Sequence, residues 1–580
     1  MVGTEVSRKK FILRARFLCT LFVIAALLIV VRLYFLQIVH GAAYREEALG
    51  QYTAQAPQTP RRGSIYFTDK DGGLVSAAVM QTGWRIAINP KLLGSASQAF
   101  AKLSAIVPLD RSGFFASAEK KNDSYEEVAF RVNDSAGQKI RAQKIPGVML
   151  VADQWRFYPG EGLAAQTLGF VAFPKEGNVK IGVYGLEKQY DRMLIEESSG
   201  LYVNPFAQIF TNIESALSKD PSGHEGSLIT TIEPSVQREL EKTLDGVVAE
   251  YSPRLAGGIV MDPKSGAVVA IAGRPGFDSN AYGSVDDPAA FDNILVSGRY
   301  ELGSIMKPLT MAAALDSGAV TPATTYKDEG CLERSTFTIC NFDHKARGVV
   351  GVQEILSQSL NVGASYLAEK MGQSTQTRYM RLYGLGERTG IDLPNEVAGD
   401  LSPLGNGRGP EVNYDTAAYG QGVSVSPIEM VRALAALANE GVLPSPHVVS
   451  AFKYETGLTR AVSVPSGTRV LKAQTASTVS DMLVKVFDEG LLHGELKMEH
   501  YTIAAKTGTA QIAKPGGGYY PNGTFLHSFF GYFPAHDAKF IVFLFAVEPH
   551  GVEYASASLA PPFMDVAKFL INYYNIPPDR

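Results

Sequence analysis

The stretch ELGSIMKPLT, residues 301–310, places a serine and a lysine three positions apart and follows the lysine at once with a proline. If a helix begins at Ser304, Lys307 lies one turn further on and shares the same helix face. Pro308 fits this arrangement, because the N–H that it lacks would have bonded the carbonyl of Ser304, at the helix start. A helix start also offers free N–H groups and the positive end of the dipole, which stabilise an oxyanion. The stretch therefore predicts a nucleophilic serine beside a lysine.

The serine-x-x-lysine pattern carries little weight alone, because it occurs four times, at Ser7, Ser117, Ser304 and Ser450. A serine hydroxyl is a poor nucleophile without a base, and a lysine acts as a base only when it is neutral. Bringing a lysine pKa from ~10.4 to ~7 costs roughly 4 kcal/mol. Burial and a second nearby cation supply such a shift. The hypothesis therefore requires another lysine or arginine from elsewhere in the chain.

Two later stretches meet this requirement. Ser359-Leu360-Asn361 lies on a helical pattern over residues 357–372, where serine and asparagine can line a cleft. Lys506-Thr507-Gly508-Thr509 lies on a strand-like run, where Gly508 lets a ligand approach the backbone and Lys506 is the candidate second cation. Serine-x-x-lysine, serine-x-asparagine and lysine-threonine-glycine, in this order, form the active-serine set of penicillin-binding proteins and serine β-lactamases. A further lysine-serine-glycine at residues 264–266 falls in a predicted hairpin turn and is interpreted as turn chemistry.

The resemblance extends well beyond these three motifs. The chain resembles the class B penicillin-binding proteins, and most of all the FtsI-type septal peptidoglycan transpeptidases. RRGSIYFTDKDG (61–72), RFYPGEGLAAQTLG (156–169) and GVYGLEKQYDRML (182–194) resemble the three membrane-proximal motifs of that family. MDPKSGAVVAIAGRPGFDSNAY, YELGSIMKP, AAYGQGVSVSPIEM and AAKTGTAQ then follow in the family's order. Leu302 and Gln166 depart from the family, which more often has proline and histidine there.

The resemblance implies a serine acyl transfer. Ser304 attacks the penultimate D-Ala carbonyl of a donor stem peptide ending in D-Ala-D-Ala, and Lys307 takes the proton. Ser359 relays protons and holds Lys307, while Asn361 contacts the substrate amide. An acceptor amine then resolves the acyl-enzyme, and a β-lactam imitates the donor.

The lysine-threonine-glycine strand is implied to hold the rest of the donor. Lys506 and Thr507 bind its terminal carboxylate, and Gly508 leaves room for the ligand. The N–H of Thr509 completes the oxyanion hole with that of Ser304. The resemblance implies no cofactor and no metal.

The expected fold is α+β. Hairpin, helix and strand patterns from residue 227 predict helices against a sheet. The resemblance makes residues 227–578 a penicillin-binding/serine β-lactamase-like transpeptidase domain with an antiparallel sheet. Residues 40–222 are expected to form an elongated, mostly β pedestal, of the type called a penicillin-binding protein dimerisation domain.

The N-terminus predicts a membrane anchor. Residues 1–16 are basic, and residues 17–39 form a 23-residue, mainly apolar run whose only charge is Arg32. Such a run crosses ~30 Å of hydrocarbon as a helix, and the basic residues before it keep the N-terminus inside. We expect a single-pass protein of the cytoplasmic (inner) membrane, with a cytoplasmic tail and an extracytoplasmic catalytic domain. A cleaved signal peptide, with its site near residues 41–43, stays open as the alternative.

Composition narrows the partners. The chain has 580 residues, a formal charge of −4 and no long basic run, which suits two or three domains and argues against nucleic acid. Cys331 and Cys340 lie close together, and either a disulfide or two thiols remains open. His344 lies near them, but this spacing forms no recognisable zinc site.

The resemblance, taken with these observations, implies a peptidoglycan D,D-transpeptidase that works during division. No glycosyltransferase-like region is visible, so the family implies an FtsW-type glycan polymerase and other division membrane proteins as partners. Three alternatives remain: an elongation-specific class B transpeptidase, a β-lactamase or β-lactam sensor, and a catalytically silent division scaffold. The sequence settles neither the acceptor amine nor the choice between division and elongation.

Overall fold

The computed structural model describes residues 62–175, 180–195, 226–335, 337–454, 457–514, 516–520 and 524–580, together with Ile24, Leu27 and Arg32. The chain divides into two units, Met1–Pro60 and Arg61–Arg580. In the first unit the three described residues are helical and exposed. The rest of the predicted anchor, the tail and the alternative cleavage site lie outside the described residues. Within the described part of the chain, every helix is either too short or too polar to span a bilayer.

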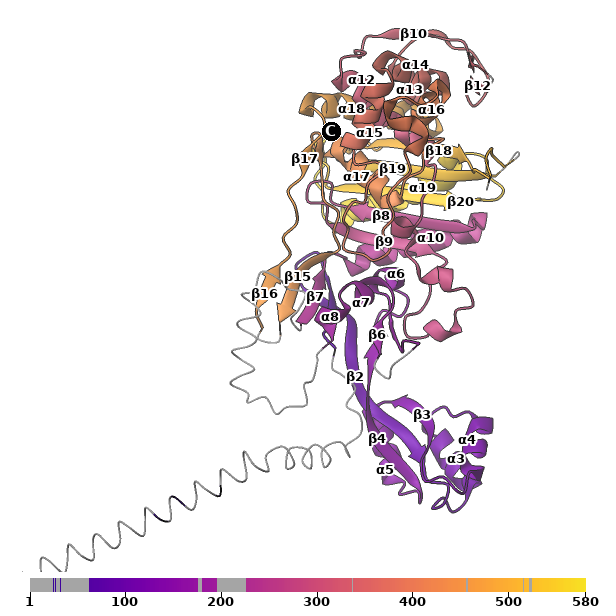
Figure 1. The fold of residues 1–580 in the computed structure, drawn as a ribbon, viewed down its shortest axis with the longest axis vertical. Coiled ribbons are helices and arrows are strands. Elements are labelled where there is room, and N and C mark those ends of the chain that lie inside the picture. The colour runs from indigo at the N-terminus through magenta and orange to yellow at the C-terminus, as the bar shows by residue number, and fades with distance from the viewer. Residues whose placement is uncertain are drawn as a thin grey trace, which may run out of the picture. The chain divides into compact units, whose positions relative to one another are not determined.

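The second unit contains a five-stranded antiparallel sheet in the order β18-β19-β20-β8-β9 (Figure 1). The strands are β18 (Ala504–Gln511), β19 (Phe525–Phe533), β20 (Phe540–Val547), β8 (Leu255–Met261) and β9 (Val268–Arg274). Every residue of β20 is buried, as expected of a central strand covered on both faces. Helices α10 (Pro234–Tyr251) and α19 (Ala555–Tyr573) pack together on one face. The predicted antiparallel sheet with helices is confirmed.

A layer of helices adjoins the β18 edge of this sheet. Its members include α12 (Lys307–Asp316), α14 (Asn361–Met371) and α18 (Ala473–Lys485). The first eight residues of α12 are all buried, and α12 contacts both α14 and α18. The short 3₁₀ turn η5 (Gly303–Met306) precedes α12 and lies against β18. Ser304 therefore lies where the sheet edge meets the helical layer.

The second sheet combines strands from both sides of the predicted boundary at residues 222–227. Its order is β16-β15-β7-β1-β2-β3, with β4 also paired to β2. β7 (Gly226–Thr230) pairs in parallel with β1 (Ile65–Thr68) and antiparallel with β15 (Val449–Tyr454). The other strands are β2 (Leu74–Ile88), β3 (Glu126–Val132), β4 (Val148–Phe157) and β16 (Thr459–Ala461). The two expected domains thus share one sheet.

The expectation of a mostly β pedestal is wrong. The helices α3 (Ala96–Ser104), α4 (Arg111–Glu119) and α5 (Asp134–Ala142), nine residues each, pack with β2, β3 and β4 around a small apolar core. Each helix begins directly after a polar residue whose side chain accepts from the first-turn amides: Ser95, Asp110 or Asn133. A helix of two and a half turns is too short to show a clear apolar periodicity in the sequence. The capping residues are therefore the main feature from which these helices could have been predicted.

The other α-helices and strands range from two residues in β5 to twelve in α17. They are α6 (Ala165–Leu168), β5 (Val171–Ala172), β6 (Ile181–Gly182), α7 (Gly185–Gln189), α8 (Asp191–Leu194), α11 (Ile294–Ser297), β10 (Thr325–Asp328), β11 (Cys331–Arg334), β12 (Phe337–Cys340), β13 (Gly348–Gly351), α13 (Gln353–Ser357), α15 (Gln373–Leu382), α16 (Glu411–Ala417), α17 (Pro427–Ala438), β14 (Val442–Leu443) and β17 (Thr468–Arg469).

A buried ionic cluster joins the three membrane-proximal motifs. Glu187 is fully buried and accepts from the Nε atoms of Arg62 and Arg156, the latter at 2.6 Å. Tyr158 donates its hydroxyl to the same carboxylate at 3.2 Å. Burial opposes the charge of Glu187, but the two guanidinium groups outweigh it and hold its pKa below the usual value. The motifs therefore meet at one carboxylate that needs both arginines.

The substitution Glu187→Ala is expected to lower the free energy of unfolding by about 3–5 kcal/mol, because it leaves the buried Arg156 guanidinium without a carboxylate and Arg62 with Asp191 alone. Chemical denaturation of the purified protein measures this. Glu489→Ala, which removes an exposed i,i+4 pair with Lys485, should change it by less than about 0.5 kcal/mol. A loss in Glu187→Ala as small as that of the control would contradict the role given to the cluster.

Candidate active site

The amine of Lys307 lies at the centre of the site. Its Nζ is 3.0 Å from Ser304 Oγ, 2.6 Å from the Ser359 carbonyl, 3.2 Å from Ser359 Oγ and 2.9 Å from Asn361 Oδ1. The side chain has no exposed surface. A neutral amine has two N–H donors and one lone pair. It can donate to the Ser359 carbonyl and to Asn361 while its lone pair accepts the hydroxyl proton of Ser304.

The surroundings of Lys307 favour this neutral form. Burial first, and then the charge of Lys506, lowers the pKa of Lys307 well below its usual value. Burial also lowers the pKa of Lys506 to about 7. Lys506 Nζ donates to Ser359 Oγ at 3.1 Å and to the Thr507 carbonyl at 3.0 Å. The Ser359 hydroxyl thus lies between the two lysine nitrogens.

The serine-x-x-lysine motif forms a 3₁₀ turn that runs into a helix. Ser304 lies in η5, Lys307 is the first residue of α12, and Pro308 lies in the first helical turn as predicted. Residues three apart eclipse each other in a 3₁₀ turn, which brings the serine oxygen above the lysine nitrogen. Gly303 has a φ of +67° and its amide donates to the Gly420 carbonyl at 3.1 Å, which fixes the entry into the turn.

The serine-x-asparagine motif does not lie within a continuous helix, and the predicted helix over residues 357–372 is wrong at this point. α13 ends at Ser357, α14 begins at Asn361, and Ser359 between them has a φ of +55°. A left-handed residue cannot continue a helix, so the Ser359 carbonyl turns to Lys307. Asn361 Nδ2 donates to the Cys340 carbonyl at 2.9 Å, which directs its Oδ1 to Lys307.

The lysine-threonine-glycine motif lies on β18, against the η5 turn that carries Ser304. A Cβ on Gly508 would lie 2.7 Å from the Leu302 carbonyl oxygen and 3.2 Å from the Ser304 nitrogen, so only glycine fits. Thr509 Oγ1 accepts from the Ala555 amide at 3.2 Å. The structure thus joins five predicted residues in one hydrogen-bonded network: Ser304, Lys307, Ser359, Asn361 and Lys506. Thr507, Gly508 and Thr509 follow beside it on the strand.

The other copies of these patterns lie elsewhere. Residues 264–266 form the turn between β8 and β9, where Ser265 Oγ donates to Asp262 at 2.6 Å, as expected. Ser117 Oγ donates to Glu126, and Ser450 Oγ donates to the Ile229 carbonyl. Ser7 lies outside the described residues.

Residues not assigned to the chemistry also border the site. The ring of Tyr419 has its centroid 5.9 Å from Lys307 Nζ. Tyr519 donates its hydroxyl to Glu301 Oε2 at 3.0 Å. Glu301 lies within the ELGSIMKPLT stretch, but no pattern in the sequence connects it to Tyr519.

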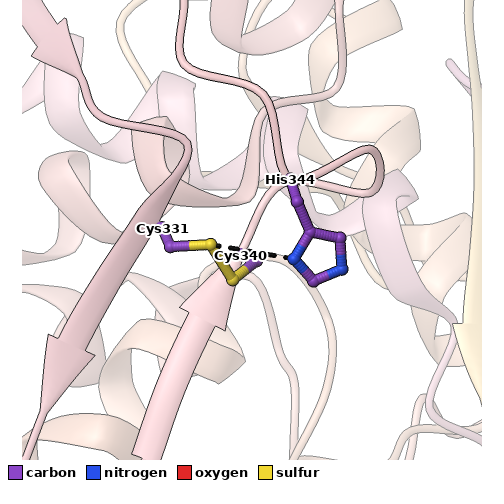
Figure 2. A group of neighbouring side chains, drawn as sticks. All are labelled: Cys331, Cys340 and His344. Atoms are coloured by element: carbon purple, nitrogen blue, oxygen red, sulfur yellow. Dashed lines mark hydrogen bonds between the residues drawn. A yellow bond between two sulfur atoms is a disulfide. The ribbon is translucent and has the colours of Figure 1, made fainter.

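A disulfide closes the hairpin that orients Asn361. Cys331 on β11 and Cys340 on β12 are bonded, with an S–S distance of 2.05 Å, which decides between the two alternatives left open by the sequence. Figure 2 shows the ring of His344 beside this bond, with Nδ1 3.8 Å from Cys331 Sγ. The ligand atoms of these three residues lie within 4.8 Å of one another. Sulfur atoms bonded to each other are not thiolates, which are the form of cysteine that binds zinc.

Comparison with known proteins identifies the family. Residues 256–568 match the family model of the penicillin-binding protein transpeptidase domain, and residues 57–207 match that of the penicillin-binding protein dimerisation domain. The chain belongs to the penicillin-binding protein transpeptidase family. The expected family and its serine-type acyl-transfer chemistry are therefore confirmed.

Similar proteins match this penicillin-binding protein over most of their own length. Stage V sporulation protein D of Bacillus subtilis is 28% identical over 93% of this chain and 82% of its own. Peptidoglycan D,D-transpeptidase FtsI of Buchnera aphidicola is 23% identical over 99% of this chain and 98% of its own. The crystal structure of penicillin-binding protein 2X from Streptococcus thermophilus superposes with a TM-score of 0.71 at 20% identity, over 90% of this chain and 81% of that one. That last likeness shows the fold.

Proposed function

We propose that this penicillin-binding protein cross-links peptidoglycan stem peptides through an acyl-enzyme on Ser304. The contact between Ser304 Oγ and the buried amine of Lys307, at 3.0 Å, carries the proposal. It gives the serine a base that is neutral where an ordinary lysine is charged. Relatives named peptidoglycan D,D-transpeptidase support the substrate, a stem peptide ending in D-Ala-D-Ala.

The first half of the reaction releases D-Ala. Ser304 Oγ attacks the penultimate D-Ala carbonyl as its proton passes to Lys307 Nζ. The backbone N–H groups of Ser304 and Thr509 hold the oxyanion, at about 3 kcal/mol for each donor. The C–N bond then breaks, and the terminal D-Ala leaves with the proton. In the second half an acceptor amine attacks the ester, its proton returns through Lys307, and Ser304 is freed.

The remaining residues position the donor. Lys506 and Thr507 bind the terminal carboxylate from β18, where Gly508 leaves the strand open to the ligand. Asn361 keeps one N–H and one lone pair beyond its bonds to Cys340 and Lys307, and these contact the substrate amide. Ser359 Oγ, between the two lysine nitrogens, relays protons.

The test is covalent labelling by radiolabelled penicillin. The wild-type protein is expected to be labelled, and Ser304→Ala is expected to lose all labelling. Ser117→Ala is the matched control, because it removes a serine that also precedes a lysine by three positions. Labelling of Ser304→Ala at the wild-type rate would refute the mechanism, and an unlabelled wild type would favour the catalytically silent scaffold. Release of the label within seconds would favour a β-lactamase.

We further propose that the protein acts in septal wall synthesis, anchored by residues 17–39 beside an FtsW-type glycan polymerase. The apolar run and relatives named FtsI support this proposal. The elongation-specific type is the second candidate, since both types share the site. Depletion in the source cells is expected to give filaments, as division fails while growth continues. Round cells would contradict the septal role and favour elongation.

A further inference from the structure

Glu301 is a partly buried carboxyl group close to the nucleophile. It lies three residues before Ser304 and accepts the hydroxyl of Tyr519 at 3.0 Å. Burial raises its pKa, and the Gly422 amide and the Tyr519 hydroxyl oppose that shift. Among the residues that the structure describes, no lysine, arginine or histidine forms an ion pair with it. A carboxylate in such a place is stabilised by a cation, and here the protein provides none.

The segment that carries Glu301 forms part of the wall of the site. It lies between β18, where Gly303 meets Ala510, and residues 419–422, where Gly420 packs against Gly303. Burial raises the pKa of Tyr419, and the charges of Asp415 and Glu301 raise it further. The Tyr419 ring itself is 5.9 Å from Lys307 Nζ. The charge of Glu301 thus acts on the ring that borders the reacting groups.

The charges around the site favour a cationic ligand at this position. Lys307 and Lys506 are buried next to the reacting groups. Whenever Lys506 is protonated, its positive charge repels an ammonium group that approaches them. Of the two acids that act on Tyr419, Asp415 already accepts from Arg334 Nε at 2.9 Å. Of these two acids, only Glu301 has no cationic partner among the described residues, so it can bind a positively charged group of the substrate.

We propose that Glu301 binds an ammonium group carried by the stem peptide. The proposal rests on the function proposed above and deepens it. Two groups of the same chemistry fit: the amine of the acceptor, and the side-chain amine of a diamino acid in the donor. Tyr519 orients the carboxylate from the hairpin between β18 and β19, and the stem peptide supplies the cation that the protein lacks.

The test compares wild type with Glu301→Gln in two arms. The donor arm measures D-Ala release from an L-Lys-D-Ala-D-Ala peptide with its side-chain amine free or acetylated. The acceptor arm measures the partition of the acyl-enzyme between a peptide amine, cationic at neutral pH, and hydroxylamine, which is neutral. Glutamine removes the charge and keeps one oxygen that can accept from the Tyr519 hydroxyl or from the Gly422 amide. Glu499→Gln, whose side chain is 89% exposed, is the matched control.

The preference for the cationic substrate is expected to fall at least tenfold in Glu301→Gln in one arm, which identifies the source of the ammonium group, and to stay unchanged in Glu499→Gln. Equal wild-type rates with and without the charge in both arms, or a wild-type preference retained by Glu301→Gln, would overturn the proposal and leave Glu301 as an anchor for Tyr519. Glu301→Met, which has a similar length and no charge, gives the same comparison if the glutamine variant does not fold. Penicillin labelling of Ser304 separates the two proposals, because a labelled protein without amine preference refutes only this one.

Discussion

The buried amine of Lys307 is the constraint on which the site depends. A charged lysine without a carboxylate partner is costly in a protein interior, so the group is stable there mainly as the neutral base. Lys506 reinforces this by adding a second positive charge to the same buried region. The amine in turn holds three chain segments together: the turn with Ser304, the break at Ser359 and the start of α14 at Asn361.

These segments are held in place by residues that take no part in the reaction. Gly508 lets the η5 turn lie directly against β18, because a Cβ there would meet the backbone of Leu302 and Ser304, and Gly303 permits the positive φ at which this turn begins. The disulfide hairpin presents the Cys340 carbonyl to Asn361, and so determines which end of that amide meets Lys307. Lys307 is thus held by close packing and by hydrogen bonds to neutral groups, and not by an ion pair with a carboxylate.

The sequence predicted most of the chemistry and less of the architecture. The three motifs contain the five residues that form the network. They predicted this site because the three motifs in this order are far more specific than any one of them alone. The break at Ser359 escaped prediction, since a positive φ at a serine is decided by the tertiary contacts of its carbonyl. The pairing of β7 with β1 and β15, and the contact of Tyr519 with Glu301, join segments more than 150 residues apart, and no local pattern records them.

The most direct test of this account is the protonation of Lys307 itself, followed by NMR in protein labelled at lysine Cε and assigned with Lys307→Arg. The account predicts that Lys307 titrates well below the exposed lysines, so that it loses its proton first as the pH rises. Removing the neighbouring charge with Lys506→Gln should move that titration to higher pH. A Lys307 resonance that titrates together with the surface lysines would contradict the account.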